Sequence, residues 1–352
     1  MGLTAVHVRG KRKSSSSKFS KPPKALQPHE QQHTRKKAKR SMSDVMAAHS
    51  SKERSNLDTL PSEILEKILL YSQNLSLPHA SLVIGAKLSE RATLIRLLIW
   101  AFHETWDQWF GVPTSTTLLH GPPVMGKPQT KCHGDHVLQT AVLKQPWAKI
   151  DYLLQAQQTW ADNNAYGRWF QHSIPWNDEP DELGHSHHGG PSHYNAHKCF
   201  DVDYSQATNW SPFRVESMAW GTQDIHPKTR IPEDLITGPW DEEQTKRLFW
   251  LARGGMLIAS QDFDMPPWEM KIELLRNAVL NCTKPNMIVI NCLIGAWVFQ
   301  DLPGEVVRKE LNDLDRRIKW GDDTDLMRTI LQRTRNVMST FQDYRQMRRS
   351  SV

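Results

Sequence analysis

The sequence predicts a mainly α-helical protein that begins with a disordered basic tail. After residue 56, apolar residues recur every three or four positions, often behind a proline or an acidic residue that suits a helix start. Residues 1–56 are instead rich in Ser, Lys, Arg, Gln and His, with few large apolar side chains. Such a segment cannot bury enough apolar surface to offset the entropy lost on ordering. We therefore expect a tail (1–56) followed by helical domains.

Charge is divided unevenly between the tail and the rest of the chain. Of the 44 Lys and Arg residues, 14 lie in residues 1–56, together with 3 of the 38 Asp and Glu residues. The tail thus carries a net charge of +11, and the remaining residues, with 30 basic and 35 acidic side chains, carry −5. A nucleic-acid-binding body would show a basic patch, so the sequence argues against a specific nucleic-acid partner.

The tail contains two basic clusters that bear on location. One runs from Arg9 to Lys13, and the second resembles a nuclear import signal; it consists of Arg35, Lys36, Lys37, Lys39 and Arg40. The alternative is a solvated tail that contacts RNA non-specifically through counterion release. No apolar signal peptide opens the chain, and its four cysteines are too few for a disulfide scaffold. We expect the protein in the nucleus, the cytoplasm or both, with no membrane association.

The stretch from residue 57 to residue 110 predicts a compact module of three helices. Pro61 suits the first turn of a helix, with Asp58 or Thr59 as its cap. An apolar stripe follows at helical spacing. Pro78 opens a second short helix. A third helix begins near Ser89 and continues through three tryptophans, Trp100, Trp106 and Trp109, which we expect to pack against the next long helix.

Two strings in this module resemble an F-box of the form common in filamentous fungi. The first is Leu-x-x-Leu-Pro-x-Glu-Ile-Leu-x-x-Ile-Leu at Leu57–Leu69. The second is Leu-Pro-x-Ala-Ser at Leu77–Ser81, followed by Gly-Ala-x-Leu-Ser at Gly85–Ser89. The resemblance covers about an eighth of the chain. It departs from many F-boxes at Ser89-Glu90-Arg91, where a Cys/Ser-Arg-x-Trp pattern is absent.

This resemblance implies a function and a set of contacts. An F-box docks onto the Skp-family adaptor of cullin ubiquitin ligases, so the chain would be a non-catalytic, substrate-recognition subunit without a cofactor. The body after residue 110 would select an unknown target protein. The alternative is that the three helices are ordinary core. The residues implied to contact the adaptor are Leu57, Leu60, Pro61, Ile64, Leu65, Ile68, Leu77, Pro78, Leu82 and Val83.

Residues 111–240 form a mixed region rich in Trp and His, with one long predicted helix at Pro146–His172. The alternative function, a hydrolase or metal-dependent enzyme, would lie in residues 120–240. Gly121–Pro128 resembles half of a phosphate-binding loop but lacks its Ser/Thr ending. His185–Cys199 offers imidazole and thiol groups, but glycines and a proline interrupt it, so we expect no metal site. We also expect 172–226 to be irregular.

Residues 241–350 predict a helical domain. The helices expected here are Thr245–Arg253, Pro266–Leu280, Asn286–Trp297, Gly304–Arg317 and Asp325–Met347. In two of them, a run of apolar residues is followed by a glycine and a second small residue, at Gly254 and at Gly295. These two glycines are about forty residues apart. This spacing is consistent with degenerate ankyrin-like helical repeats, and an irregular helical domain is the other interpretation.

Overall fold

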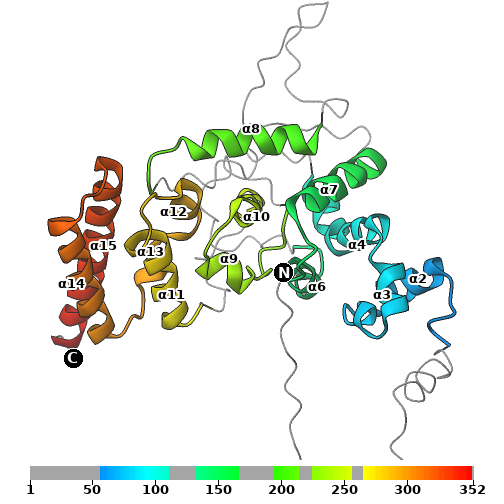
Figure 1. The fold of residues 1–352 in the computed structure, drawn as a ribbon, viewed down its shortest axis with the longest axis horizontal. Coiled ribbons are helices and arrows are strands. Elements are labelled where there is room, and N and C mark those ends of the chain that lie inside the picture. Colours follow the sequence, from blue (N-terminus) through cyan, green and yellow to red (C-terminus); the bar gives the residue numbers. More distant parts are fainter. Residues whose placement is uncertain (1–55, 111–131, 166–193, 214–223, 256–264, 351–352) are drawn as a thin grey trace, which may run out of the picture. The chain divides into compact units, whose positions relative to one another are not determined.

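Helices make up the regular structure of the part of the chain that the computed structural model describes (Figure 1). It describes residues 56–110, 132–165, 194–213, 224–255 and 265–350, with side chains up to residue 342, and no strand is present in these ranges. The prediction of a mainly α fold is confirmed. The helices are α2 (Ser62–Ser72), η1 (Leu77–His79), α3 (Leu82–Leu88), α4 (Arg91–Trp109), α6 (His136–Leu143), α7 (Ile150–Asn164), α8 (Ala196–Thr208), α9 (Glu233–Thr237), α10 (Glu242–Arg253), α11 (Trp268–Leu275), η3 (Arg276–Leu280), α12 (Met287–Leu293), α13 (Ala296–Phe299), α14 (Gly304–Trp320) and α15 (Asp325–Ser350).

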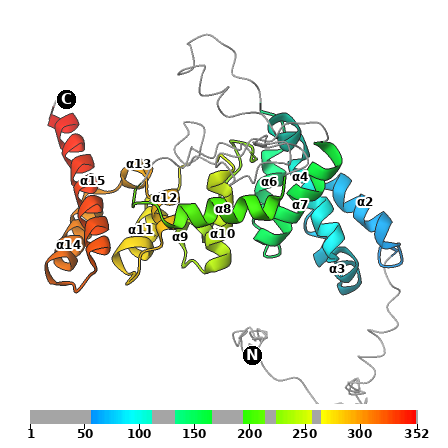
Figure 2. The same ribbon diagram turned by 90° about the horizontal axis from the view of Figure 1, so that it is seen from above.

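The described residues from residue 56 onward belong to one compact unit. The domain boundaries at residues 110 and 240 stay predictions. Both ribbon views place α2 and α3 at one end of this unit and α14 and α15 at the other (Figures 1 and 2). Between them, α4 packs on α7, α7 on α8, and α10 on α12. Buried apolar side chains from all of these helices belong to one hydrophobic core.

An aromatic cluster at the second half of α4 joins the module to the rest of the unit. Trp106 is fully buried, stacks on Phe102 at 5.3 Å between ring centroids, and meets the edge of Trp160 of α7 at 5.8 Å. Its indole N–H donates to the backbone oxygen of Asp224 at 3.0 Å. Phe102 meets Trp250 of α10 at 5.7 Å. The contact predicted between α4 and the next long helix is therefore present at Trp106.

Several predicted helix boundaries need correction. The helix expected at Pro146–His172 starts at Ile150, because residues 145–149 form turns, and its described part ends at Asn164. The helix expected at Asn286–Trp297 breaks into α12 and α13 around Gly295. The helix expected at Pro266–Leu280 ends in a π-helical turn, η3.

The region expected to be irregular, 172–226, contains the helix α8. The side chain of Asn195 caps it by accepting from the backbone N–H of Lys198 at 2.9 Å. One face of α8 is buried at the spacing of an amphipathic helix, with Ala196, Cys199, Phe200, Asp203 and Ala207. The expectation of irregular structure was therefore wrong for residues 196–208.

Three features singled out in the sequence lie outside the described residues. These are the tail with its import-like cluster Arg35–Arg40, the loop Gly121–Pro128, and the histidines between His185 and His193. The ankyrin-like repeat also stays a prediction. The two helices that it would pair differ in length, because α10 has 12 residues and α12 has 7. Within the described ranges, no helix has both the length and the apolar character that crossing a membrane requires.

Candidate protein-interaction surface

The helices α2, η1, α3 and the first half of α4 share a core made by one face of each helix. Leu69, Ile84, Leu88 and Leu98 are all at most 1% exposed. Leu65 and Leu77, two of the ten residues implied to contact an adaptor, also lie in this core, at 0% and 9% exposed. Their implied role needs correction, because a side chain inside the module cannot meet a partner without unfolding it. Leu65 and Leu77 instead pack in the core beneath the exposed residues.

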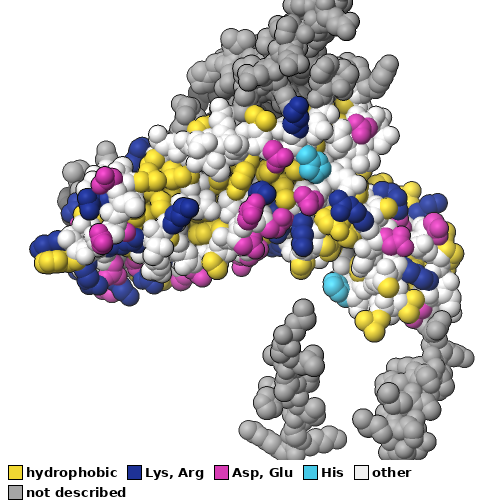
Figure 3. Space-filling model, turned by 45° about the horizontal axis from the view of Figure 1, so that its top comes forward, with side chains coloured by type: hydrophobic (Ala, Val, Ile, Leu, Met, Phe, Trp, Pro, Cys, Tyr) yellow, Lys and Arg dark blue, Asp and Glu magenta, His cyan; other side chains and the backbone are white. Residues whose placement is uncertain are grey.

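The other residues of that set reach the surface. Leu82 is 94% exposed at the first position of α3, and Ile64 is 42% exposed in the first turn of α2. Leu57, Pro61 and Val83 are also exposed, and Leu60, Ile68 and Pro78 are partly buried. We call Leu57, Pro61, Ile64, Leu82 and Val83 the apolar face. Hydrophobic side chains are visible among charged ones at this end of the unit (Figure 3).

Polar contacts hold residues 57–60 against α3. The hydroxyl of Ser81 donates to the carboxylate of Asp58 at 2.5 Å, while its oxygen accepts from the backbone N–H of Ile84 and so caps α3. The ammonium group of Lys87 donates to the backbone oxygens of Asp58 and Leu60 at 2.9 and 2.7 Å. Asp58 therefore does not cap α2, as the sequence suggested; it binds the cap of α3. These bonds fix Leu57 relative to Leu82 and Val83.

A glycine allows α3 to approach η1 closely. A Cβ atom at Gly85 would lie 2.7 Å from the backbone oxygen of Pro78, inside van der Waals contact. Only a residue without a side chain fits there, so Gly85 sets the spacing between Pro78 and α3. By contrast, a Cβ atom at Gly304, at the start of α14, would meet nothing within 4 Å.

A bidentate ion pair ties α2 to α4 beside this surface. Arg96 donates through Nε and Nη2 to the two carboxylate oxygens of Glu66, and the hydroxyl of Thr93 donates to Glu66 at 3.0 Å. The hydrogen bond from Arg96 lowers the pKa of Glu66, with Thr93 adding to the effect. Glu66 is therefore ionised at neutral pH, and the charge of Arg96 is neutralised locally.

A buried ion pair joins α8 to α10 in the described part of the middle of the chain. Arg253 of α10 donates to Asp203 of α8 at 2.6 Å, and both side chains are at most 4% exposed. Burial raises the pKa of Asp203 against the opposing effect of Arg253. An exposed counterpart is the pair Arg335–Asp315, whose side chains are 42% and 52% exposed. Asp203 and Arg253 thus form a buried pair that links α8 to α10.

Two side chains considered as metal ligands, Cys199 and His197, lie on different sides of α8. Cys199 is fully buried, and burial raises its pKa to about 12, so the thiol stays protonated. His197 lies on the exposed side of the same helix. His136 stacks on His226 at 5.2 Å, and burial, followed by His136, lowers the pKa of His226. In the described ranges, no three His, Cys, Asp or Glu side chains are grouped as metal ligands.

Comparisons with family models, with curated proteins and with solved structures found no match to this chain. Sequence reasoning found the exposed apolar residues, but it gave Asp58 another role and missed Lys87; both hold residues 57–60 against α3. Lys87 is one turn after Val83 on α3, yet nothing local in the sequence indicates that its ammonium group bonds carbonyls 27 and 29 residues earlier.

Proposed function

We propose that this chain is the substrate-recognition subunit of an F-box-type ubiquitin ligase and that the apolar face binds a Skp-family adaptor. The observation that carries the proposal is the exposure of Leu57, Ile64, Leu82 and Val83 on the elements that match the F-box strings. Exposed apolar residues gathered on one surface mark an interaction site more often than scattered ones do. Leu82 in particular contributes nothing to the module's own core.

The construction of the surface supports binding rather than packing. Asp58, Ser81 and Lys87 form bonds that hold residues 57–60 in place, so an adaptor would meet a preformed surface and little ordering entropy would be lost. The chain itself performs no bond chemistry in this proposal. It supplies proximity, because a target bound to the body stands at high effective concentration near catalytic subunits on other chains.

Co-purification with a Skp-family adaptor tests the proposal. Ile64→Asp and Leu82→Asp should each weaken binding by about 30-fold or more, because a buried interface position does not accept an unpaired charge. Leu326→Asp is a matched control, since Leu326 is 44% exposed and, like Ile64, lies in the first turn of a helix that accepts an acidic residue. Equal adaptor binding by all four proteins would contradict the proposal, and circular dichroism would confirm that each variant is folded.

A further inference from the structure

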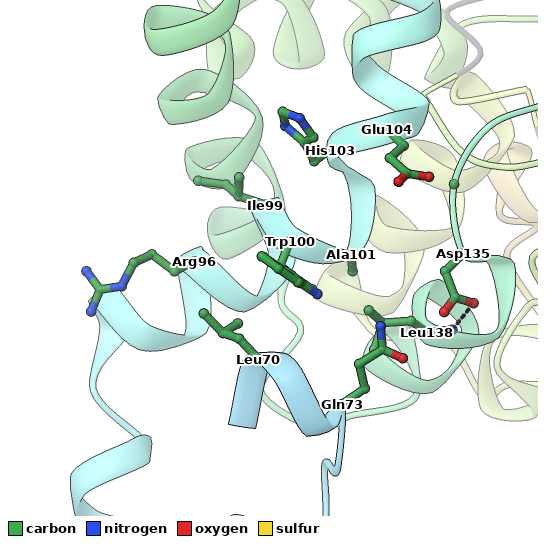
Figure 4. A pocket seen from close by; sticks show the side chains of 11 residues that line it. Leu70, Gln73, Arg96, Ile99, Trp100, Ala101, His103, Glu104, Asp135 and Leu138 are labelled. Atoms are coloured by element: carbon green, nitrogen blue, oxygen red, sulfur yellow. Dashed lines mark hydrogen bonds between the residues drawn. The ribbon is translucent and has the colours of Figure 1, made fainter. Parts of the chain in front are cut away.

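A second surface lies where α4, the end of α2 and the start of α6 meet. It is a pocket of about 500 Å³, within the range of sites that bind small ligands or single anchor side chains. Its walls are largely apolar, and Trp100, which is 44% exposed, stands at the centre (Figure 4). The other apolar lining residues are Leu70, Ile99, Ala101 and Leu138.

The charged groups of this pocket leave it acidic. Arg96 lies at one end in Figure 4, but its guanidinium group is paired with Glu66. Glu104 and Asp135 lie at the other end. Neither carboxylate forms an ion pair within the described ranges; Asp135 accepts only from two backbone N–H groups of α6, at 2.9 and 3.0 Å. The pocket therefore combines an apolar centre with two carboxylates that form no ion pair with a described residue.

The two walls of the pocket are held together by a buried polar contact. The amide of Gln139 on α6 donates to the hydroxyl of Thr105 at 2.9 Å and to the backbone oxygen of Ala101 at 3.2 Å. Its oxygen accepts from the backbone N–H of His226 at 3.0 Å. This fully bonded amide fixes α6 relative to α4, so the pocket is preformed and binding would require little ordering.

The pocket does not coincide with the apolar face. Residues on an α-helix are spaced by about 100°, so the lining residue Leu70 points about 120° away from Ile64 around α2, while Gln73 follows the helix as its C-cap. The Leu82 and Val83 side chains do not line the pocket. A partner on the apolar face and a second partner in the pocket can therefore be bound together.

We propose that this pocket holds a target protein through a short segment that has a large apolar anchor side chain next to a lysine or arginine. The anchor would pack on Trp100, and the basic group would meet Glu104 and Asp135, whose charge selects against acidic segments. This inference rests on the proposed function, because it names the class of target that the ligase subunit would select. A site at the base of the F-box module would also place that target at a fixed geometry to the adaptor.

Fluorescence anisotropy of the full chain with labelled short peptides tests this inference. The probes are Ser/Gly peptides with one central Leu, Phe or Trp, flanked by Lys and Arg, by Ser, or by Glu. We expect the basic set to bind with a Kd of about 1 mM or tighter, and the acidic set to bind more weakly. Raising the salt concentration should weaken binding of the basic set, because the exposed charges are screened.

Point variants assign the binding to the pocket. Trp100→Ala should weaken it by about 30-fold, as expected for an aromatic anchor. Glu104→Gln and Asp135→Asn should each weaken it by about threefold, as for exposed charge pairs, and asparagine can still cap α6. Trp320→Ala, which removes a 75% exposed tryptophan of α14, is the matched control and should leave binding unchanged.

Several results would overturn the inference. These are the absence of peptide binding, equal binding of the acidic set, and full binding by Trp100→Ala. Two others would reassign the pocket: binding of an apolar fluorophore but of no peptide, which indicates a small-molecule site, and dimerisation lost in Trp100→Ala, which indicates a second copy of the chain. Adaptor binding is measured separately with Ile64→Asp, so the loss of one activity with retention of the other shows which proposal failed.

Discussion

Replacing Trp106 tests whether the F-box-like module and the helical body behave as one folding unit. Trp106→Ala removes a fully buried indole that contacts Phe102 and Trp160 and donates to the backbone oxygen of Asp224. A buried tryptophan contributes about 200 Å² of apolar area, which corresponds to about 5 kcal/mol. Loss of the hydrogen bond adds about 1 kcal/mol. We therefore expect the free energy of unfolding to fall by about 4–6 kcal/mol, since partial collapse of the cavity offsets some of the loss.

The assay is urea unfolding followed by far-ultraviolet circular dichroism and by tryptophan fluorescence. Because Trp106 bridges α4, α7 and the segment at Asp224, both probes should report one transition that moves to lower urea in the variant. The melting temperature should fall by about 10–20 °C for a unit of this size. Trp320→Ala, on the exposed surface of α14, should change little. A loss below about 1 kcal/mol, or a separate early transition of the module, would refute the reasoning.

Three other predictions concern single contacts. Gly85→Ala should weaken adaptor binding and destabilise the protein by about 1–3 kcal/mol, because its Cβ atom clashes with a backbone oxygen, whereas Gly304→Ala should be neutral in the same unfolding assay. Asp203→Ala should lower the free energy of unfolding by about 3–5 kcal/mol, because it leaves the buried guanidinium group of Arg253 without its carboxylate. The exposed control Asp315→Ala should lower it by about 1 kcal/mol or less. Equal effects in urea unfolding would show that burial of the pair does not matter. The pKa of His226 is lowered, which means that the folded state favours the neutral imidazole. The stability that His226 contributes is therefore fully present above about pH 6.5, the pKa of histidine in the unfolded chain, and it is lost as the pH falls below that value. Melting temperatures of His226→Asn should accordingly fall less between pH 7 and pH 5 than those of the unchanged protein, and parallel curves would contradict this.

The helices α2 and α4 could be predicted well because the residues that define them lie within or next to the helices themselves. Pro61 and the stripe containing Ile64 and Ile68 define α2 without reference to any other element. The role of Trp100 was harder to predict. Trp100 and Trp106 are six residues apart, which places them about 120° apart around α4. Trp106 therefore faces α7, while Trp100 is left half exposed and lines the pocket rather than the contact with α7.

The missed elements depend on partners distant in the sequence. The face of α8 has helical spacing, but it includes Asp203, which is stable there only because Arg253 arrives from α10 fifty residues later. The segment Leu57–Leu60 is likewise held by Lys87, almost thirty residues away. The pocket combines α2, α4 and α6, and the expectation of a mixed region at 111–240 with one long helix did not include α6. Such contacts follow from tertiary packing, which local periodicity does not encode.

The most direct test of the proposed function is hydrogen–deuterium exchange of the full chain with and without a purified Skp-family adaptor. Binding should slow exchange in residues 57–68 and 82–88, which carry the apolar face, because an interface there excludes water from exposed amides and suppresses local opening. Exchange in α14 and α15, at the other end of the unit, should stay unchanged. Absence of binding, or protection confined to elements other than α2, η1 and α3, would contradict the assignment of this surface to the adaptor.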